Sequence, residues 1–171
     1  MQKFFKFSET ISGTTFFLRM LFTILLSIPG IIIFISFVAN YLTSSGLIDI
    51  SDPNFDQGAF QQSIQENPDE FMSSMLDSMT SNWIIALIIS FIPAVWFSLA
   101  SYYKRISALF FEQRKNIFAI YVGFQIISDA TSYGILPILS FAKTGFSILS
   151  LLIILFLVFK NSEIDKDDHE G

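Results

Sequence analysis

Residues 20–39 read MLFTILLSIPGIIIFISFVA and contain no charged side chain. A helix needs about 20 consecutive apolar residues to cross a bilayer core, so this run predicts a transmembrane helix, which we place at residues 16–42. The run is too long for the apolar region of a secretory signal and lacks a small-x-small cleavage site, which favours a retained signal anchor. The Pro29-Gly30 pair lies near its middle and predicts a kink.

The forty residues that follow, 43–82, contain seven carboxylates and no Lys or Arg. Cytoplasmic loops of membrane proteins carry an excess of basic residues, so a long segment without any is typical of the external side. The acidic residues are Asp49, Asp52, Asp56, Glu66, Asp69, Glu70 and Asp77. We therefore expect residues 43–82 to form an external loop.

The composition of the whole chain agrees with a membrane protein. Hydrophobic residues make up 52%, Phe occurs 21 times, and charged residues make up 15%, below the roughly 25% usual for soluble domains. The net charge of -5 is a sum over segments that we place on opposite sides of the bilayer. There is no Cys, which excludes disulfides and thiolate metal sites.

A second span is predicted at residues 83–103, with Pro93 near its centre and aromatic anchors (Trp83, Tyr102, Tyr103) at its ends. The next segment, 104–116, is basic and is expected to be a cytoplasmic loop that anchors the protein at the lipid headgroups. Its basic residues are Lys104, Arg105, Arg114 and Lys115. With Lys3, Lys6 and Arg19 at the amino-terminal end and Lys160 and Lys166 in the tail 160–171, nine basic residues then lie inside. The segment 1–15 and both termini are then cytoplasmic.

Residues 117–159 are long enough for two further spans, helices 3 and 4, joined by a tight turn. Two positions for the turn compete. A turn at residues 140–145 leaves Asp129 inside the third helix, whereas a turn at residues 133–137 places Asp129 and Lys143 on facing helices as a candidate charge pair. An unpaired charge in hydrocarbon costs roughly 2.5 to 3.5 kcal/mol even on the lenient scale, so pairing is plausible.

The external loop contains a strong helix start at Asn67-Pro68-Asp69-Glu70, with an Asn cap, Pro at the first position and a Glu able to bond back. We expect an amphipathic helix at residues 68–80. Its apolar face is a candidate partner-binding surface, formed by Phe71, Met72, Met75, Leu76 and Met79. An earlier helix is possible at residues 53–65.

Candidate chemical sites are few. Residues 52–63 place oxygen ligands at alternate positions, but the glycine falls one place late for a calcium loop and Ser63 stands where a bidentate acid is needed. His169 lies in an acidic tail without a base, nucleophile or metal cluster. Because phosphate-binding, zinc-hydrolase and serine-hydrolase motifs are also absent, we expect no enzymatic activity, cofactor, nucleic-acid partner or identifiable small-molecule substrate.

Three short motifs give the chain a resemblance to a known family. They are Phe4-Phe5-Lys6-Phe7 followed by Ser12-Gly13-Thr14-Thr15-Phe16-Phe17, then Lys104-Arg105-Ile106-Ser107-Ala108, and finally Phe159-Lys160-Asn161-Ser162-Glu163. In this order they resemble small bacterial inner-membrane proteins of the domain of unknown function 805 family. The family's arginines after Gly13 are missing here, and Ser107-Ala108 stand in place of its His-Asp pair. The resemblance implies four spans and implies no activity.

The sequence thus predicts an all-α, four-span protein of a bacterial inner membrane, with kinked first and second spans and a partly helical external loop. We expect an accessory subunit that contacts other membrane proteins, or itself as an oligomer, through its spans and the loop 43–82. The alternative is a small transporter or channel component that uses Asp129 in an oligomer.

Overall fold

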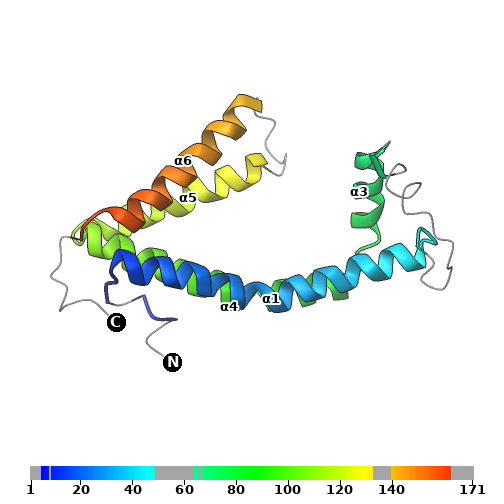
Figure 1. Cartoon of the computed structure of the whole chain (residues 1–171), viewed down its shortest axis with the longest axis horizontal. Helices are drawn as coiled ribbons and strands as arrows, with labels where there is room; N and C mark the ends of the chain where they lie inside the picture. The colour runs from blue at the N-terminus through cyan, green and yellow to red at the C-terminus, as the bar shows by residue number, and fades with distance from the viewer. Residues whose placement is uncertain (1–4, 8, 49–63, 66, 133–139, 163–171) are drawn as a thin grey trace. The chain divides into compact units, whose positions relative to one another are not determined.

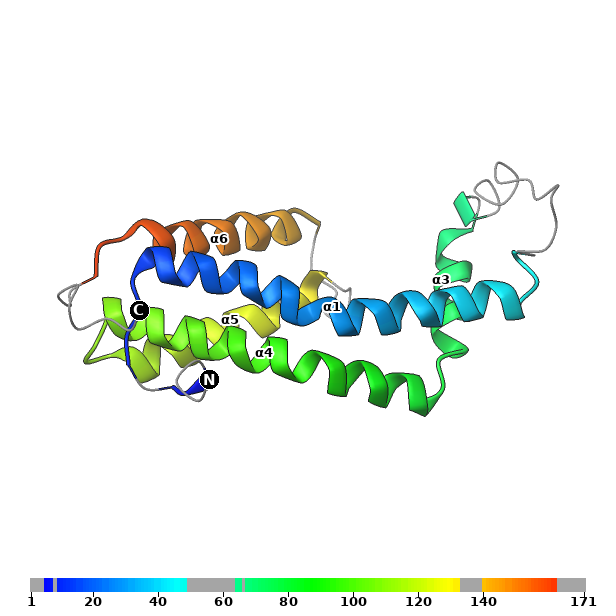
Figure 2. The same cartoon turned by 60° about the horizontal axis from the view of Figure 1, so that its bottom comes forward.

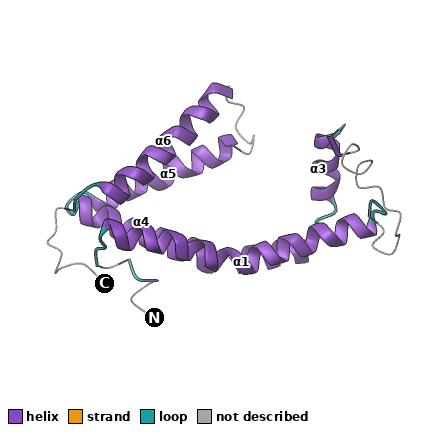
Figure 3. Cartoon of the chain, viewed as in Figure 1, coloured by secondary structure: helices purple, strands orange, loops and turns teal. Residues whose placement is uncertain are grey.

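The computed structural model describes residues 5–7, 9–48, 64–65, 67–132 and 140–162. Over these ranges every regular element is a helix and no strand occurs (Figure 3), which confirms the all-α prediction for them. Figure 1 labels the helices, which are α1 (Gly13–Ser44), α3 (Pro68–Asp77), α4 (Ser81–Leu109), α5 (Arg114–Ser132) and α6 (Ser140–Phe159).

Two of the described helices, α1 and α4, are long and apolar enough to cross a membrane. They contain the first two predicted spans and extend beyond them at both ends. Pro29 lies inside α1 and Pro93 inside α4, so each helix continues past its proline. The predicted kinks, and the prediction that α5 and α6 also cross the membrane, stay predictions.

α1 and α4 run antiparallel, and Figure 2 shows them side by side. Their aromatic contacts show the antiparallel direction, because an early residue of α1 contacts a late residue of α4, and a late residue of α1 contacts an early one. Phe16 packs edge-on against Tyr102 with ring centroids 5.1 Å apart, and Phe37 packs in the same way against Trp83 at 5.6 Å. Such edge-to-face pairs contribute about 0.5–1.5 kcal/mol each beyond the area that they bury.

The chain divides into two compact units, each with parts of both long helices. The first unit comprises residues 1–24 and 94–171 and contains a buried hydrophobic cluster, formed by Ile11, Phe16, Ile106, Leu109 and Leu157. This cluster joins the segment before α1 to the ends of α4 and α6. It forms the core around which the polar groups of the first unit are arranged.

The second unit comprises residues 25–93. Within it, Gly30 is buried, and a Cβ atom added there would lie 2.5 Å from the ring of Phe91. That spacing is far below van der Waals contact, so only glycine allows α1 to approach this ring so closely. Gly30 therefore has a packing role in addition to the predicted kink at Pro29-Gly30.

α5 and α6 lie side by side in the first unit (Figure 1). α5 ends at Ser132 and α6 begins at Ser140. Residues 140–145 are thus helical, and the alternative that placed the turn there is wrong. The other alternative, with Asp129 and Lys143 on two successive helices, agrees with these boundaries, although residues 133–139 lie outside the described ranges.

α4 continues past Tyr103 to Leu109, so Lys104 and Arg105 lie in a helix instead of the predicted loop 104–116. The helix persists because Ile106 and Leu109 belong to the buried cluster of the first unit and fix one face of this last part of α4. The connection to α5 is correspondingly short, since α5 already begins at Arg114.

α3 confirms that a helix starts at Pro68, with Asn67 at the N-cap position. The predicted capping box is not formed, because Asn67 makes no side-chain cap hydrogen bond and has φ -137° and ψ 63°. Asp69 and Glu70 in the first turn still favour the helix dipole. The helix ends at Asp77 instead of residue 80, and of the possible helix 53–65 only Ile64 and Gln65 lie in the described part of the chain.

Candidate functional site

Arg105 lies at the centre of the first unit with only 1% of its surface exposed. Its Nε donates a hydrogen bond to the carbonyl oxygen of Leu157 at 2.5 Å, and its Nη1 donates to that of Ile11 at 3.2 Å. Its Nη2 donates to the carbonyl oxygen of Lys160. The last carbonyl groups of a helix lack partners within it and carry partial negative charge, so the guanidinium caps the end of α6.

The start of α1 packs tightly against the same end of α6. The Ser12 hydroxyl accepts a hydrogen bond from the Thr15 backbone N–H at 3.1 Å, which caps the first turn of α1. A Cβ atom added to Gly13 would lie 2.0 Å from the Val158 carbonyl oxygen and 3.3 Å from Nη2 of Arg105. Ser12 and Gly13 thus allow three segments to meet at one buried arginine.

Lys104 is fully buried, and its Nζ lies 3.8 Å from a carboxylate oxygen of Glu9. Glu9 has φ of 82°, a backbone conformation that non-glycine residues rarely adopt. The prediction that Lys104 and Arg105 contact lipid headgroups is therefore wrong, because both side chains are enclosed by protein. Arg114 is half-buried and Lys115 is exposed, so these two stay available as the basic anchor.

A pocket of about 250 Å³ opens beside this ion pair, where α4 ends and α5 begins, and we call it the Arg114 pocket. The Arg114 guanidinium lies over the ring of Phe111, 4.4 Å from its centroid. The residues that line the Arg114 pocket are Phe7, Glu9, Thr10, Tyr103, Ser107, Phe111 and Arg114. The pocket thus combines one anionic group, one cationic group, the hydroxyls of Thr10, Tyr103 and Ser107, and aromatic walls.

The wall of the Arg114 pocket is held by aromatic contacts. Phe7 packs edge-on against Tyr103 at 5.5 Å and against Trp96 at 5.3 Å between ring centroids. Phe118 packs against Tyr103 at 5.2 Å. The Trp96 indole N–H also donates to the carbonyl oxygen of Phe5 at 3.0 Å. Residues 5–7 are therefore fixed on α4 by aromatic packing and one hydrogen bond.

A second pocket of about 340 Å³ lies in the second unit, beside α3 and the end of α1. The Tyr41 hydroxyl and the Ser74 hydroxyl are hydrogen-bonded at 2.7 Å, and Tyr41 packs edge-on against Phe71 at 5.9 Å. The lining residues of this Tyr41 pocket are Tyr41, Ser45, Leu47, Ile64, Asn67, Glu70, Phe71 and Ser74. Tyr41 of α1 thus contacts α3 through one hydrogen bond and one ring pair.

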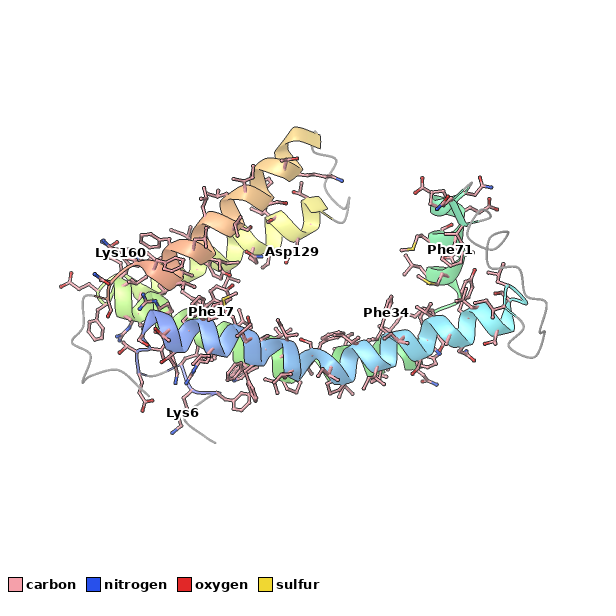
Figure 4. All side chains as sticks on the ribbon, in the orientation of Figure 1. Lys6, Phe17, Phe34, Phe71, Asp129 and Lys160 are labelled. Atoms are coloured by element: carbon pink, nitrogen blue, oxygen red, sulfur yellow. The ribbon has the colours of Figure 1, made fainter. Side chains whose placement is uncertain are left out.

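The candidate partner-binding face of α3 divides into two parts. Met75 is buried, and Phe71, labelled in Figure 4, is half-buried, as is Met79. Met72 is 48% exposed and Leu76 is 54% exposed. Phe71 packs on Tyr41 within the chain, so only Met72 and Leu76 remain available to a partner.

The candidate charge pair is not formed within the described side chains. Asp129, labelled on α5 in Figure 4, is exposed, and no ion pair joins it to the half-buried Lys143 of α6. Two neighbours of Asp129 on α5, Ser128 and Thr131, are buried. The carboxylate therefore lies on the side of α5 away from its packed surface.

The described residues contain no group of three or more His, Cys, Asp and Glu side chains that could hold a metal ion. The possible cation loop 52–63 lies outside the described ranges, and so does His169.

Comparison with protein-family models gave no match, and neither did comparison with curated proteins or with solved structures. The resemblance to the domain of unknown function 805 family therefore stays a prediction from the three short motifs.

Proposed function

We propose that the protein is a non-catalytic integral protein of a bacterial inner membrane, an accessory subunit that binds other membrane proteins or a second copy of itself. The observation that carries this proposal is the exposure of Met72 and Leu76 on α3, in the segment predicted to be external. Two adjacent apolar side chains on a water-facing helix favour a covering partner, and Met adapts well to irregular surfaces.

The membrane location is supported by how little of α1 and α4 is covered. Only 11% of the apolar window of α1 and 22% of that of α4 are buried within the protein. A helix in the core of a soluble domain would be mostly buried, so these surfaces require another apolar environment. Exposed aliphatic and aromatic side chains continue along α1, among them Phe17 and Phe34 in Figure 4.

Partner binding is testable by native electrophoresis of protein extracted from its own membrane in a mild detergent. We expect the unmodified chain to migrate in an assembly larger than one copy. Replacing both Met72 and Leu76 with Ser should shift it to the position of the single chain, because the exposed apolar surface of α3 is removed. Both side chains are exposed, so the fold should tolerate the change.

A matched control changes the exposed polar side of the same helix, with Ser73→Ala and Asp77→Asn in one variant. This variant should retain the assembly. The proposal would be abandoned if the unmodified protein ran as a single chain, or if the Met72/Leu76 variant kept the assembly of the unmodified protein.

A second candidate function, a transporter or channel component, is favoured by the exposure of Asp129 on α5. If α5 crosses the bilayer, a carboxylate on its outer side requires a partner charge or water, which an oligomer could supply. Liposomes that contain the unmodified protein should then show ion or proton flux, and Asp129→Asn should abolish it. An unchanged flux would remove this candidate, since Asn keeps the shape and loses the charge.

A further inference from the structure

The Arg114 pocket lies at a level where a lipid headgroup would be found if α4 crosses the bilayer. Tyr103 and Ser107 belong to the last turns of α4, and Arg114 is the first residue of α5. The basic residues assign this end of α4 to the cytoplasmic surface. The pocket therefore faces ligands at the membrane surface and is separate from the proposed partner surface on α3.

One group in the pocket suits a phosphate. Arg114 is half-buried, and its guanidinium lies over the Phe111 ring, so it is already placed at the pocket before any ligand binds. Arginine presents several N–H donors in a planar fork that matches phosphate oxygens. The Ser107 hydroxyl lines the same pocket, but it already donates to the Tyr103 carbonyl oxygen at 2.8 Å. Arg114 is therefore the main hydrogen-bond donor to a phosphate in this pocket.

Another part of the pocket suits an ammonium group. The Glu9 side chain is 38% exposed and lies 3.8 Å from Lys104, so one side of its carboxylate remains open to the pocket. The rings of Phe7 and Tyr103 also line it, and aromatic faces attract cations, whereas the Phe111 ring already has the Arg114 guanidinium over it. A ligand with only negative charge would meet Glu9 at a cost, whereas a ligand with both charges would satisfy both ends.

We infer that the Arg114 pocket binds a phosphoethanolamine group, with its phosphate on Arg114 and its primary ammonium on Glu9 and the aromatic wall. The source is either the headgroup of phosphatidylethanolamine in the membrane or a soluble phosphoethanolamine ester. The pocket volume of about 250 Å³ accommodates a group of this size, so the acyl chains of a lipid would lie outside the pocket. The site goes beyond the proposed partner binding and rests only on α4 spanning the bilayer.

The chain offers its own reporter for this binding. Trp96 packs against Phe7, a wall of the pocket, at 5.3 Å between ring centroids. Trp83 is the other tryptophan and lies in the second unit against Phe37, so Trp83→Phe leaves Trp96 as the single indole. The full chain with this substitution would be purified in an uncharged detergent, and dihexanoyl phosphatidylethanolamine would be titrated into it.

We expect a saturable change in Trp96 emission with dihexanoyl phosphatidylethanolamine. The phosphatidylcholine analogue should bind about tenfold more weakly, because its quaternary ammonium cannot donate a hydrogen bond to Glu9. The phosphatidylglycerol analogue, which has no ammonium, should be weaker by a similar factor of about ten or more. Equal affinity for the ethanolamine and glycerol lipids in the unmodified pocket would overturn the inference, without any need for a pocket variant.

Matched variants test the two ends of the ligand. Arg114→Gln should weaken binding of the ethanolamine lipid about tenfold, whereas Lys115→Gln, next to it and exposed, should not. Glu9→Gln should remove the preference for ethanolamine over glycerol, whereas Glu112→Gln should keep it. Equal effects of Arg114→Gln and Lys115→Gln would mean general charge attraction and would overturn the inference. Circular dichroism checks that each variant is folded.

A competition distinguishes the two sources. Soluble glycerophosphoethanolamine carries the same charged groups without acyl chains. Displacement of the lipid at comparable concentration would support the phosphoethanolamine site and assign it to a soluble ester. Displacement that requires about a hundredfold excess or more would support the site and assign it to the membrane lipid, because the acyl chains then contribute to binding. Failure to displace at any concentration would overturn the assignment of the headgroup.

Discussion

The Nε of Arg105 donates a hydrogen bond to the carbonyl oxygen of Leu157 over 2.5 Å, although the two residues are 52 positions apart in the chain. The same guanidinium reaches Ile11 and Lys160, so a single side chain joins the segment before α1 to the end of α6. Its charge is met by carbonyl dipoles. This arrangement depends on Gly13, whose lack of a side chain leaves room for the backbone of Val158.

Replacement of Arg105 with Met should lower the free energy of unfolding by about 3 kcal/mol or more, because three carbonyl oxygens lose a charged donor. Arg105→Lys should give an intermediate loss, since an ammonium cannot reproduce the fork of donors. The midpoint of thermal unfolding in detergent, followed by circular dichroism, measures both. Lys115→Met, at an exposed position, should change stability by no more than about 0.5 kcal/mol. Similar losses for Arg105→Met and Lys115→Met would contradict this role.

Gly13→Ala should destabilise the protein by about 1–3 kcal/mol, the usual cost of overpacking. The new Cβ would meet the Val158 carbonyl oxygen at 2.0 Å, and a backbone atom cannot move aside as a side chain can. Gly123→Ala and Gly145→Ala are matched controls, since nothing lies within 4 Å of a Cβ at either helical position. Both controls should be neutral or slightly stabilising in the same thermal assay. A tolerated Gly13→Ala would show that α1 and α6 do not approach this closely.

Gly30→Ala should also destabilise the protein, through the Phe91 ring at 2.5 Å from the new Cβ. Because the obstacle is a side chain, a smaller residue should relieve it. Gly30→Ala combined with Phe91→Leu is therefore expected to be more stable than the sum of the two single changes predicts. A double-mutant cycle on unfolding midpoints measures this coupling, and strictly additive effects would contradict a direct contact between the two positions.

The predicted orientation in the membrane can be tested by thiol labelling, because the chain contains no Cys. A single Cys in place of Ser45, at the end of α1, should react in intact spheroplasts with a maleimide that cannot cross membranes. A Cys in place of Glu112, between α4 and α5, should react only after the membrane is permeabilised. Both positions are exposed, so access by the reagent is limited by the bilayer alone. Labelling of position 112 in intact spheroplasts would contradict the predicted orientation or the prediction that α4 spans the membrane.

The sequence predicted which parts of the described chain are helical, but not where every helix ends. The uncharged run at residues 20–39 predicted α1, the Asn67-Pro68 pair predicted where α3 begins, and α4 contains the predicted second span. These features are local, since apolar length, a fixed proline φ and an available N-cap position act within one or two helical turns. The end of α4 was predicted too early because Lys104 and Arg105 are basic, and basic residues after an apolar run indicate a loop when their buried partners are not known.

The candidate sites depended on contacts that no local pattern contains. The sequence by itself determined that Lys104, Arg105, Arg114 and Lys115 lie close together in the chain. Four basic residues in one segment predict the cytoplasmic side of the membrane. Only the tertiary structure decided that Lys104 and Arg105 are buried while Arg114 lines a pocket. The physical reason is that burial of a charge depends on partners from distant segments, here the Glu9 carboxylate and the backbone carbonyls of Ile11, Leu157 and Lys160.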